Sequence, residues 1–169
     1  MRTLSLLLFI FILFSSCKHE VRYSEAGPEI ETAKAAIAAY EAGDWAAMKK
    51  NYADTVKFYH NTLEGVSFEE ATGTLNGLLS AVSEYGFDDD IEFEFVTADN
   101  GVQWVSWWGV WRGKLKANGK ELTTPVHVSA KIVDGKIAVE YGYWDNQPMA
   151  AAMAEIAAQA EAAEEESEQ

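Results

Sequence analysis

Two dipeptides in the second half of the chain constrain the fold most strongly. Asn118-Gly119 and Asp134-Gly135 are the strongest short signals for a β-hairpin, and each separates two runs rich in residues typical of strands. From Asp90 onward, apolar residues alternate with polar ones, as they do along a strand that is buried on one side. The pattern predicts an antiparallel sheet whose last strands are Gln103–Lys116, Glu121–Val133 and Lys136–Asp145.

The same turns predict which side chains share a face of the sheet. If each dipeptide is a two-residue turn, Trp111 pairs with Val126, and Val128 pairs with Tyr141. An earlier strand joins this face only if residues 99–101 form a three-residue loop with a left-handed Gly101. We call the face with these apolar partners the core face. Its expected aromatic residues are Phe93, Phe95, Trp107, Trp111, Tyr141 and Tyr143.

The opposite face, which we call the outer face, is expected to be unusually aromatic. Its expected residues include Trp104, Trp108, Trp144, His127 and Glu140. A monomer does not normally leave this much apolar surface in water. One explanation is a homodimer in which two copies pack sheet against sheet. The alternative is that a C-terminal helix covers the face through Met149, Met153 and Ile156.

The first half of the chain shows apolar residues at helical spacing. Three helices are predicted, from Pro28 to Gly43, from Asp44 to about Tyr52, and from Ser67 to Gly86. The strand-like run Val56–His60 separates the second from the third. The sequence therefore predicts an α+β fold with helices packed on a sheet, followed by an acidic Ala/Glu-rich helix or tail that should fray.

The composition limits the chemistry. The 169 residues carry a formal net charge of −14, which disfavours binding to nucleic acid. A lone cysteine excludes an intrachain disulfide, and the histidines at positions 19, 60 and 127 lack the spacing of zinc ligands. We therefore expect no metal and no other cofactor. A chain of this length with 49% hydrophobic residues fits one folded domain.

The first residues are typical of a signal peptide. Arg2 precedes an apolar run over residues 4–14 that is too short to span a bilayer. The following Phe14-Ser15-Ser16-Cys17 resembles a bacterial lipobox, in which the cysteine carries lipid after cleavage. We expect a signal peptide over residues 1–16, a lipidated Cys17 beginning a tether over 17–27, and an extracytoplasmic, membrane-anchored protein. The alternative is an ordinary signal peptide with an incidental cysteine.

Short motifs in the remaining chain resemble a known family. Gly43-Asp44-Trp45 with Met48 and the run Tyr52–Val56 are similar to the entry helices and first strand of the SnoaL-like branch of the nuclear transport factor 2-like superfamily. The run Val126–Val128 and the segment from Asp134 to Asp145 resemble its last hairpin.

This resemblance extends over residues 28–148 and implies an α+β cone, in which three N-terminal helices pack on a curved antiparallel sheet around a pocket. The family does not explain residues 149–169. A cone lined by Trp107, Trp111, Phe93, Phe95, Tyr141 and Tyr143 would bind a small, flat, apolar molecule by burying its surface. The alternative for these aromatic residues is plain core packing, and for the interleaved Gly109 and Gly113 it is a bend in the sheet.

Some members of the superfamily are polyketide cyclases or isomerases, in which a carboxylate or histidine removes a proton next to a carbonyl. Asp145 is the carboxylate expected on the core face, and its alternative role is a helix cap. His127 matches a histidine of the cyclases, but the predicted register places it on the outer face. Asp54 and His60 flank the first strand, where related enzymes sometimes place pocket residues; a solvated loop acid and a strand-end histidine are the alternatives.

Three functions remain open from the sequence. The first is binding of a small apolar molecule in the cone. The second is catalysis by a base in that cone, as in a cyclase or an isomerase. The third is a non-catalytic interaction module that uses the outer face.

Overall fold

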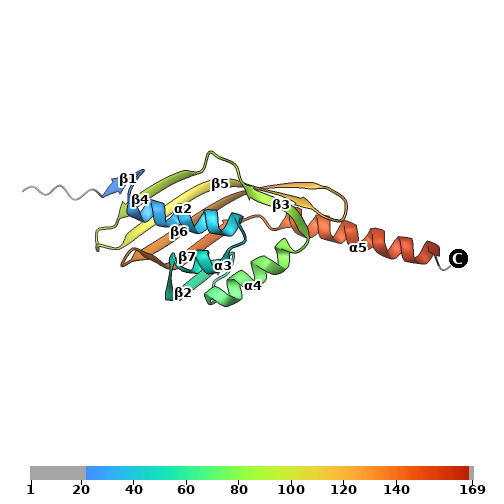
Figure 1. Ribbon diagram of the computed structural model, residues 1–169, viewed down its shortest axis with the longest axis horizontal. Helices are drawn as coiled ribbons and strands as arrows, with labels where there is room; N and C mark the ends of the chain where they lie inside the picture. Colours follow the sequence, from blue (N-terminus) through green and yellow to red (C-terminus); the bar gives the residue numbers. More distant parts are fainter. Residues whose placement is uncertain (1–21, 168–169) are drawn as a thin grey trace, which may run out of the picture.

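The chain folds into a long sheet, and helices pack on the core face of this sheet. The computed structural model describes residues 22–167, in which strands of one sheet follow the order β1-β4-β5-β6-β7-β2, with β3 paired to β5 (Figure 1). The strands are β1 (Tyr23–Ser24), β2 (Tyr52–His60), β3 (Val82–Phe87), β4 (Glu92–Thr97), β5 (Gln103–Leu115), β6 (Glu121–Val133) and β7 (Lys136–Trp144). The predicted α+β class is confirmed.

The expectation of a purely antiparallel sheet was wrong at one edge. Strand β2 runs parallel to β7, with Tyr52 beside Ile137 and His60 beside Gly142. Parallel neighbours require a long connection rather than a hairpin, and here all the strands from β3 to β6 lie between them in sequence. The sheet is therefore mixed, and β2 brings residues from the first half of the chain to β7.

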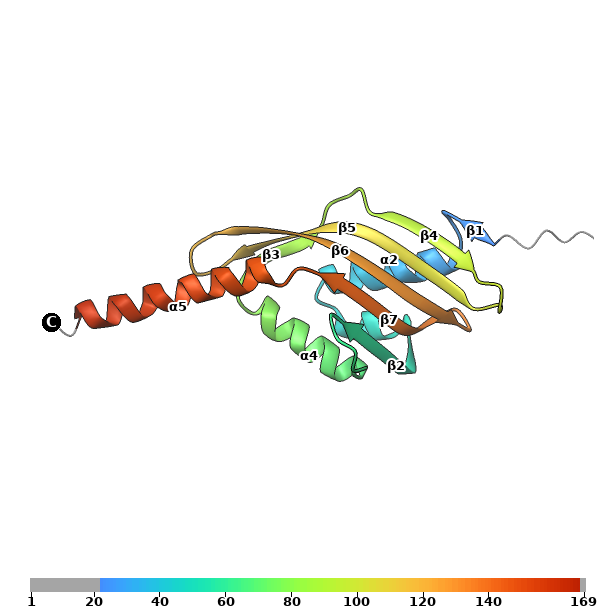
Figure 2. The same ribbon diagram turned by 180° about the vertical axis from the view of Figure 1, so that it is seen from behind.

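The helices are α2 (Pro28–Glu41), α3 (Trp45–Lys49), α4 (Phe68–Leu79) and α5 (Gln147–Ser167). Figures 1 and 2 show α2 lying across the core face of the sheet. Ile30 and Ala33 of α2 are fully or almost fully buried there. None of these helices, within the part of the chain that the structure describes, is long and apolar enough to cross a membrane.

Two segments differ from the expected elements. The predicted third helix ends at Leu79, and Val82–Phe87 forms β3 instead, because these residues pair with the far half of β5. Tertiary pairing thus overrides the helical spacing of the segment. Within the expected tether, Tyr23 and Ser24 pair with Val96 and Phe95 at the edge of β4.

The predicted three-residue loop between β4 and β5 is confirmed. Gly101 is left-handed with φ +78°, and Phe93 pairs with Trp107 while Phe95 pairs with Val105. These residues lie on the core face, as expected.

The first glycine dipeptide forms a longer turn than expected. Leu115 N–H donates to the carbonyl of Lys120, so residues 116–119 form the loop and Gly119 takes φ +68° at its end. Trp107 consequently pairs with Val128 and Trp111 with Thr124, two residues away from the predicted partners. A shift of two residues leaves every side chain on its expected face, because side chains alternate with period two.

The second hairpin contains the difference with the largest consequence. Its turn pairs Val133 with Lys136 and Ile132 with Ile137 as predicted, but Lys131 then pairs with Val139, so Ala138 is an extra residue in β7. Such a one-residue bulge moves the following side chains to the opposite face. Beyond it, Glu140, Gly142 and Trp144 lie on the core face, whereas Tyr141 and Tyr143 lie on the outer face.

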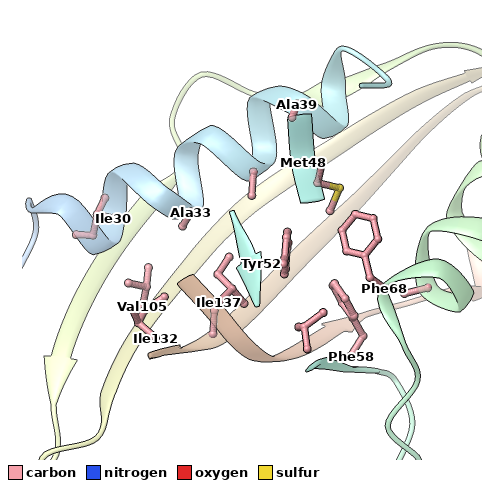
Figure 3. Packing of buried hydrophobic residues seen from close by; sticks show 14 of the residues in the cluster. Ile30, Ala33, Ala39, Met48, Tyr52, Phe58, Phe68, Val105, Ile132 and Ile137 are labelled. Atoms are coloured by element: carbon pink, nitrogen blue, oxygen red, sulfur yellow. The ribbon is translucent and has the colours of Figure 1, made fainter. Parts of the chain in front are cut away.

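The core face is filled by two hydrophobic clusters. The first lies under α2, α3 and α4 and includes Tyr52, Phe58 and Phe68 (Figure 3). The second lies under β3 and the start of α5 and includes Trp111 and Leu122. Tyr40 and Trp45 pack against both clusters and join them.

Helix α5 packs on the core face and therefore does not cover the outer face. Ala152 is fully buried in the second cluster, and Met149 and Ile156 pack against that cluster, while Met153 is 40% exposed. The alternative in which Met149, Met153 and Ile156 cover the outer aromatic residues was wrong. The C-terminal part of α5 extends away from the sheet (Figures 1 and 2).

Candidate active site around Glu140

The bulge in β7 places an acidic side chain in the hydrophobic core. Glu140 is only 8% exposed, and its backbone neighbour in β2 is Phe58. A buried carboxylate is costly unless hydrogen bonds compensate for the lost water. Glu140 has two such partners, both from β2, and the three side chains form the candidate site.

The two oxygens of Glu140 accept from different groups. Tyr52 Oη donates to Oε2 at 2.8 Å, and His60 Nε2 lies 2.9 Å from Oε1. An ionised carboxylate can only accept hydrogen bonds, so with Glu140 ionised we assign the imidazole proton to Nε2 of His60. Every buried side-chain nitrogen and oxygen in the described residues has a hydrogen-bond partner.

Tyr52 serves as a neutral donor in this network. Burial raises the pKa of its hydroxyl well above the usual range, and the negative charge of Glu140 raises this pKa further. The phenol therefore keeps its proton over the whole physiological pH range. Its ring packs against Phe58 and Phe68, with ring centroids 5.1 Å and 5.5 Å away (Figure 3).

His60 is the member of the site that can reach solvent. Its side chain is 17% exposed, compared with 10% for Glu140, and no described residue contacts its Nδ1 through a hydrogen bond. With the proton on Nε2, the lone pair of Nδ1 is free to accept a proton from another molecule. The imidazolium that would form is stabilised by the carboxylate behind it. The arrangement is that of a general base with a positioning carboxylate.

Gly142 allows two rings to lie beside this carboxylate. A Cβ atom at position 142 would stand 2.6 Å from Cζ3 of Trp144 and 2.8 Å from Cδ2 of His60. The rings of Trp144 and His60 meet edge to face, with centroids 5.0 Å apart. A larger residue at position 142 would displace one of them.

The predicted catalytic acid does not belong to this site. Asp145 is exposed, and its Oδ1 accepts from the backbone N–H of Gln147 at 2.8 Å, at the start of α5. The expectation that it shares the core face with Trp111 was wrong because the bulge reverses the faces of β7. The hydrogen bond to the first residue of α5 is the kind of contact expected from the alternative role of Asp145 as a cap of that helix.

The bulge also relocates two predicted pocket residues. Tyr141 and Tyr143 were expected on the core face, but they lie on the outer face, where Tyr141 stacks on Tyr59 with ring centroids 4.9 Å apart. His127 lies on the outer face as predicted and stacks on Trp108, with centroids 4.7 Å apart. The side chains of these three residues therefore lie on the opposite face of the sheet from Glu140.

The other predicted pocket residues are packed in the core. Trp107 and Trp111 are 7% and 8% exposed. Trp111 Nε1 donates to Tyr40 Oη, and Trp107 meets Phe87 edge to face. Phe95 is buried and Phe93 packs against the first cluster. Their role in binding a ligand stays a prediction.

The two glycines expected to leave room between these tryptophans are covered by neighbours. Side chains of Phe87 and Ile91 lie 3.2 Å and 3.3 Å from a Cβ placed at Gly109, and the Trp111 ring lies over Gly113. In the described part of the chain, no group of three or more histidines, cysteines or acidic residues is arranged to hold a metal ion.

Comparisons with known proteins identify the fold. The model of the SnoaL-like domain family matches residues 33–140. A candidate polyketide cyclase from Xanthomonas campestris is 20% identical with a TM-score of 0.59, covering 73% of this chain and 95% of its own. An NTF2-like protein of unknown function from Burkholderia pseudomallei is 15% identical with a TM-score of 0.57, and the match covers 73% of this chain and 95% of that protein.

A third solved structure has a ketosteroid isomerase-like fold. It comes from Catenulispora acidiphila in complex with trimethylamine, and it is 13% identical with a TM-score of 0.56, covering 70% of this chain and 88% of its own. No curated protein sequence matches this chain. At these identities the solved structures show the fold alone.

Proposed function

Since the chain belongs to the SnoaL-like domain family, we propose that it binds a small, flat, apolar carbonyl compound and transfers a proton on it, with His60 as the base. One observation carries this proposal: buried Glu140 holds Nε2 of His60, and Nδ1 has no hydrogen-bond partner in the described residues. A solvated strand-end histidine would not need an acid supplied from another strand. The net charge of −14 favours neutral over anionic compounds.

The reaction follows from the geometry. Nδ1 of His60 removes a proton from the carbon next to the carbonyl, and the C–H electron pair becomes the C=C bond of an enolate. The charge then rests on the carbonyl oxygen, while Glu140 stabilises the new imidazolium. In a carbonyl compound with a double bond between its β- and γ-carbons, the enolate extends to a dienolate. Return of the proton from Nδ1 to the γ-carbon then moves the double bond into conjugation with the carbonyl, so atoms and charge balance without a cofactor.

A flat aromatic ketone, 2-tetralone, tests this function without knowledge of the natural substrate. In D₂O, proton NMR follows the replacement of its α-hydrogens by deuterium. We expect the protein to accelerate this exchange over buffer, and we expect His60→Gln to lower the protein-dependent rate by about 100-fold or more. His127→Gln is the matched control, because that histidine lies on the outer face.

Equal exchange rates for the wild-type protein and His60→Gln would contradict the catalytic proposal. If the ketone binds but exchanges at the buffer rate, the domain is a binding module, which is the second candidate function. That alternative rests on the family resemblance of the fold, because Trp107 and Trp111, which were expected to line the cone, are packed in the core.

We also propose that the protein is an extracytoplasmic lipoprotein. Cys17 and the preceding apolar run, which support this proposal, lie outside the described residues. Cys17→Ala is expected to move the protein from the membrane fraction to the soluble fraction, because acyl chains on the cysteine would supply the anchor. Cell fractionation with immunoblotting measures this. Full retention of the variant in membranes would contradict lipidation at Cys17.

We propose that two copies of the chain form a homodimer in which their outer faces pack against each other. The bulge adds Tyr141 and Tyr143 to Trp104 and Trp108 on that face, and α5 leaves all four uncovered. Trp108 and Tyr143 are 43% and 53% exposed. An apolar surface of this kind is typical of contacts between copies of a chain.

A further inference from the structure

Trp144 is the residue through which the C-terminal helix reaches the candidate base. Its ring lies against His60 over Gly142. The indole Nε1 donates to Oδ1 of Asn146 at 2.6 Å, and Asn146 immediately precedes α5. The position of the indole beside His60 is therefore set in part by the segment from which α5 begins.

The backbone of Trp144 is held from the other side by Asn61. The Asn61 amide donates to the Trp144 carbonyl at 2.9 Å and accepts from its N–H at 3.2 Å. Asn61 takes φ +51°, a left-handed conformation that asparagine adopts more readily than most residues. Because the backbone is fixed in this way, the remaining freedom of Trp144 lies in its side chain, which Asn146 restrains.

Helix α5 docks on the sheet through residues 149–156. Ala152 is fully buried against the second hydrophobic cluster, Met149 and Ile156 flank it, and Lys120 Nζ pairs with Glu155 at 2.6 Å. The matched region of the SnoaL-like family ends at residue 140, so α5 lies beyond it. One face of a single helix thus connects a docking surface on β6 to the residue beside the base.

We propose that α5 is a latch that holds Trp144 against the His60 ring and limits the access of small molecules to the imidazole. When α5 is docked, Asn146 keeps the indole against the imidazole. When α5 leaves the second cluster, Asn146 is released, the indole swings away, and small molecules reach His60 more readily. Control of catalysis by the latch rests on the proposed function of His60. The effect of the latch on access to the imidazole does not depend on that function.

The test measures access rather than turnover. Ala152→Glu places a charge at a fully buried position and should undock α5, because a buried unpaired charge is strongly unfavourable. Ala154→Glu makes the same change at an exposed position of the same helix and is the matched control. Diethyl pyrocarbonate labels accessible histidines, and mass spectrometry of peptides resolves His60 from His127. Hydrogen exchange of residues 149–156 reports docking.

Ala152→Glu is expected to lose protection over residues 149–156 and to label His60 several-fold faster, with His127 unchanged. Ala154→Glu should match the wild-type protein. Undocking without faster labelling of His60 would overturn the latch, and so would continued protection of α5 in Ala152→Glu. If Ala152→Glu does not fold, Asn146→Ala removes the indole acceptor alone and should still accelerate labelling; an unchanged rate there would also overturn it.

The two proposals fail in different ways. If His60 is labelled faster in Ala152→Glu, but His60→Gln exchanges the ketone as fast as the wild-type protein, the latch is supported and the catalytic function is rejected. Slow labelling in all variants combined with loss of exchange in His60→Gln would retain the function and reject the latch.

Discussion

Replacing Glu140 by alanine is expected to lower the free energy of unfolding by about 3 kcal/mol. The change removes the hydrogen-bond acceptor of the Tyr52 hydroxyl, and Tyr52 is only 3% exposed. It also leaves a cavity beside Phe58. An unsatisfied buried donor and a cavity both destabilise the folded state. Urea unfolding monitored by tryptophan fluorescence measures the difference.

Glu140→Gln is expected to change the tautomer of the His60 imidazole with little loss of stability. Its amide oxygen can still accept from Tyr52, so we expect a loss of only about 1 kcal/mol. Its amide N–H, however, must donate to Nε2 of His60, which moves the imidazole proton to Nδ1. Nitrogen-15 NMR of labelled histidine distinguishes the two tautomers. The variant should therefore fold but lose ketone exchange.

Two results would contradict this account of Glu140. One is an Ala variant as stable as the wild-type protein, which would mean that the hydrogen bonds do not compensate for burial of the acid. The other is an Nε2-protonated His60 in Glu140→Gln. A double-mutant cycle with Tyr52→Phe isolates the coupling between Tyr52 and Glu140.

Trp108→Glu is expected to raise the dissociation constant of the proposed dimer by about 100-fold or more, because buried tryptophans contribute most to interfaces and a charge there loses its water. Sedimentation velocity over a concentration series measures this shift. Leu78→Glu is the matched control: Leu78 is 40% exposed, close to the 43% of Trp108, but it lies on α4. It should leave the association unchanged.

Charges at the margins of the outer face support a particular dimer. Glu92 and Glu94 lie on this face along β4, and Lys57 lies on it along β2 at the other side of the sheet. A two-fold axis parallel to the strands would bring the acidic margin of one copy opposite the basic margin of the other. A wild-type protein that sediments as a monomer at all concentrations would contradict the proposal.

Much of the sheet could be predicted because hairpin turns are encoded locally. The dipeptide Asp134-Gly135 fixed the first pairs of its hairpin, and the loop at residues 99–101 followed from the need to place Phe93 and Phe95 on one face. The bulge at Ala138 has no local signal of this kind. Nothing in the alternation of Ile137–Tyr141 indicates an extra residue. The bulge coincides with a register shift in the pairing of β2 with β7, between Tyr52 and Lys57, and a local sequence pattern does not encode such a long-range pairing.

The candidate site was missed for the same reason. His60 was recognised as a histidine at the end of the first strand, but its partner Glu140 was assigned to the outer face by a register without the bulge. The parallel pairing of β2 with β7 was also absent from the sequence prediction, since parallel pairs carry no turn signal. Glu140 is the charged residue of the otherwise apolar run Ile137–Tyr143, but an acid is common on the exposed side of a half-buried strand, so the sequence alone does not single it out.

The extra residue in β7 makes two properties of the protein depend on each other. The same bulge turns Glu140 inward and turns Tyr141 and Tyr143 outward, so the buried carboxylate and the two outer tyrosines come from a single backbone feature. No change in strand length at this position could remove one and keep the other. A strand β7 without Ala138 would place Glu140 and Trp144 on the outer face and both tyrosines in the core.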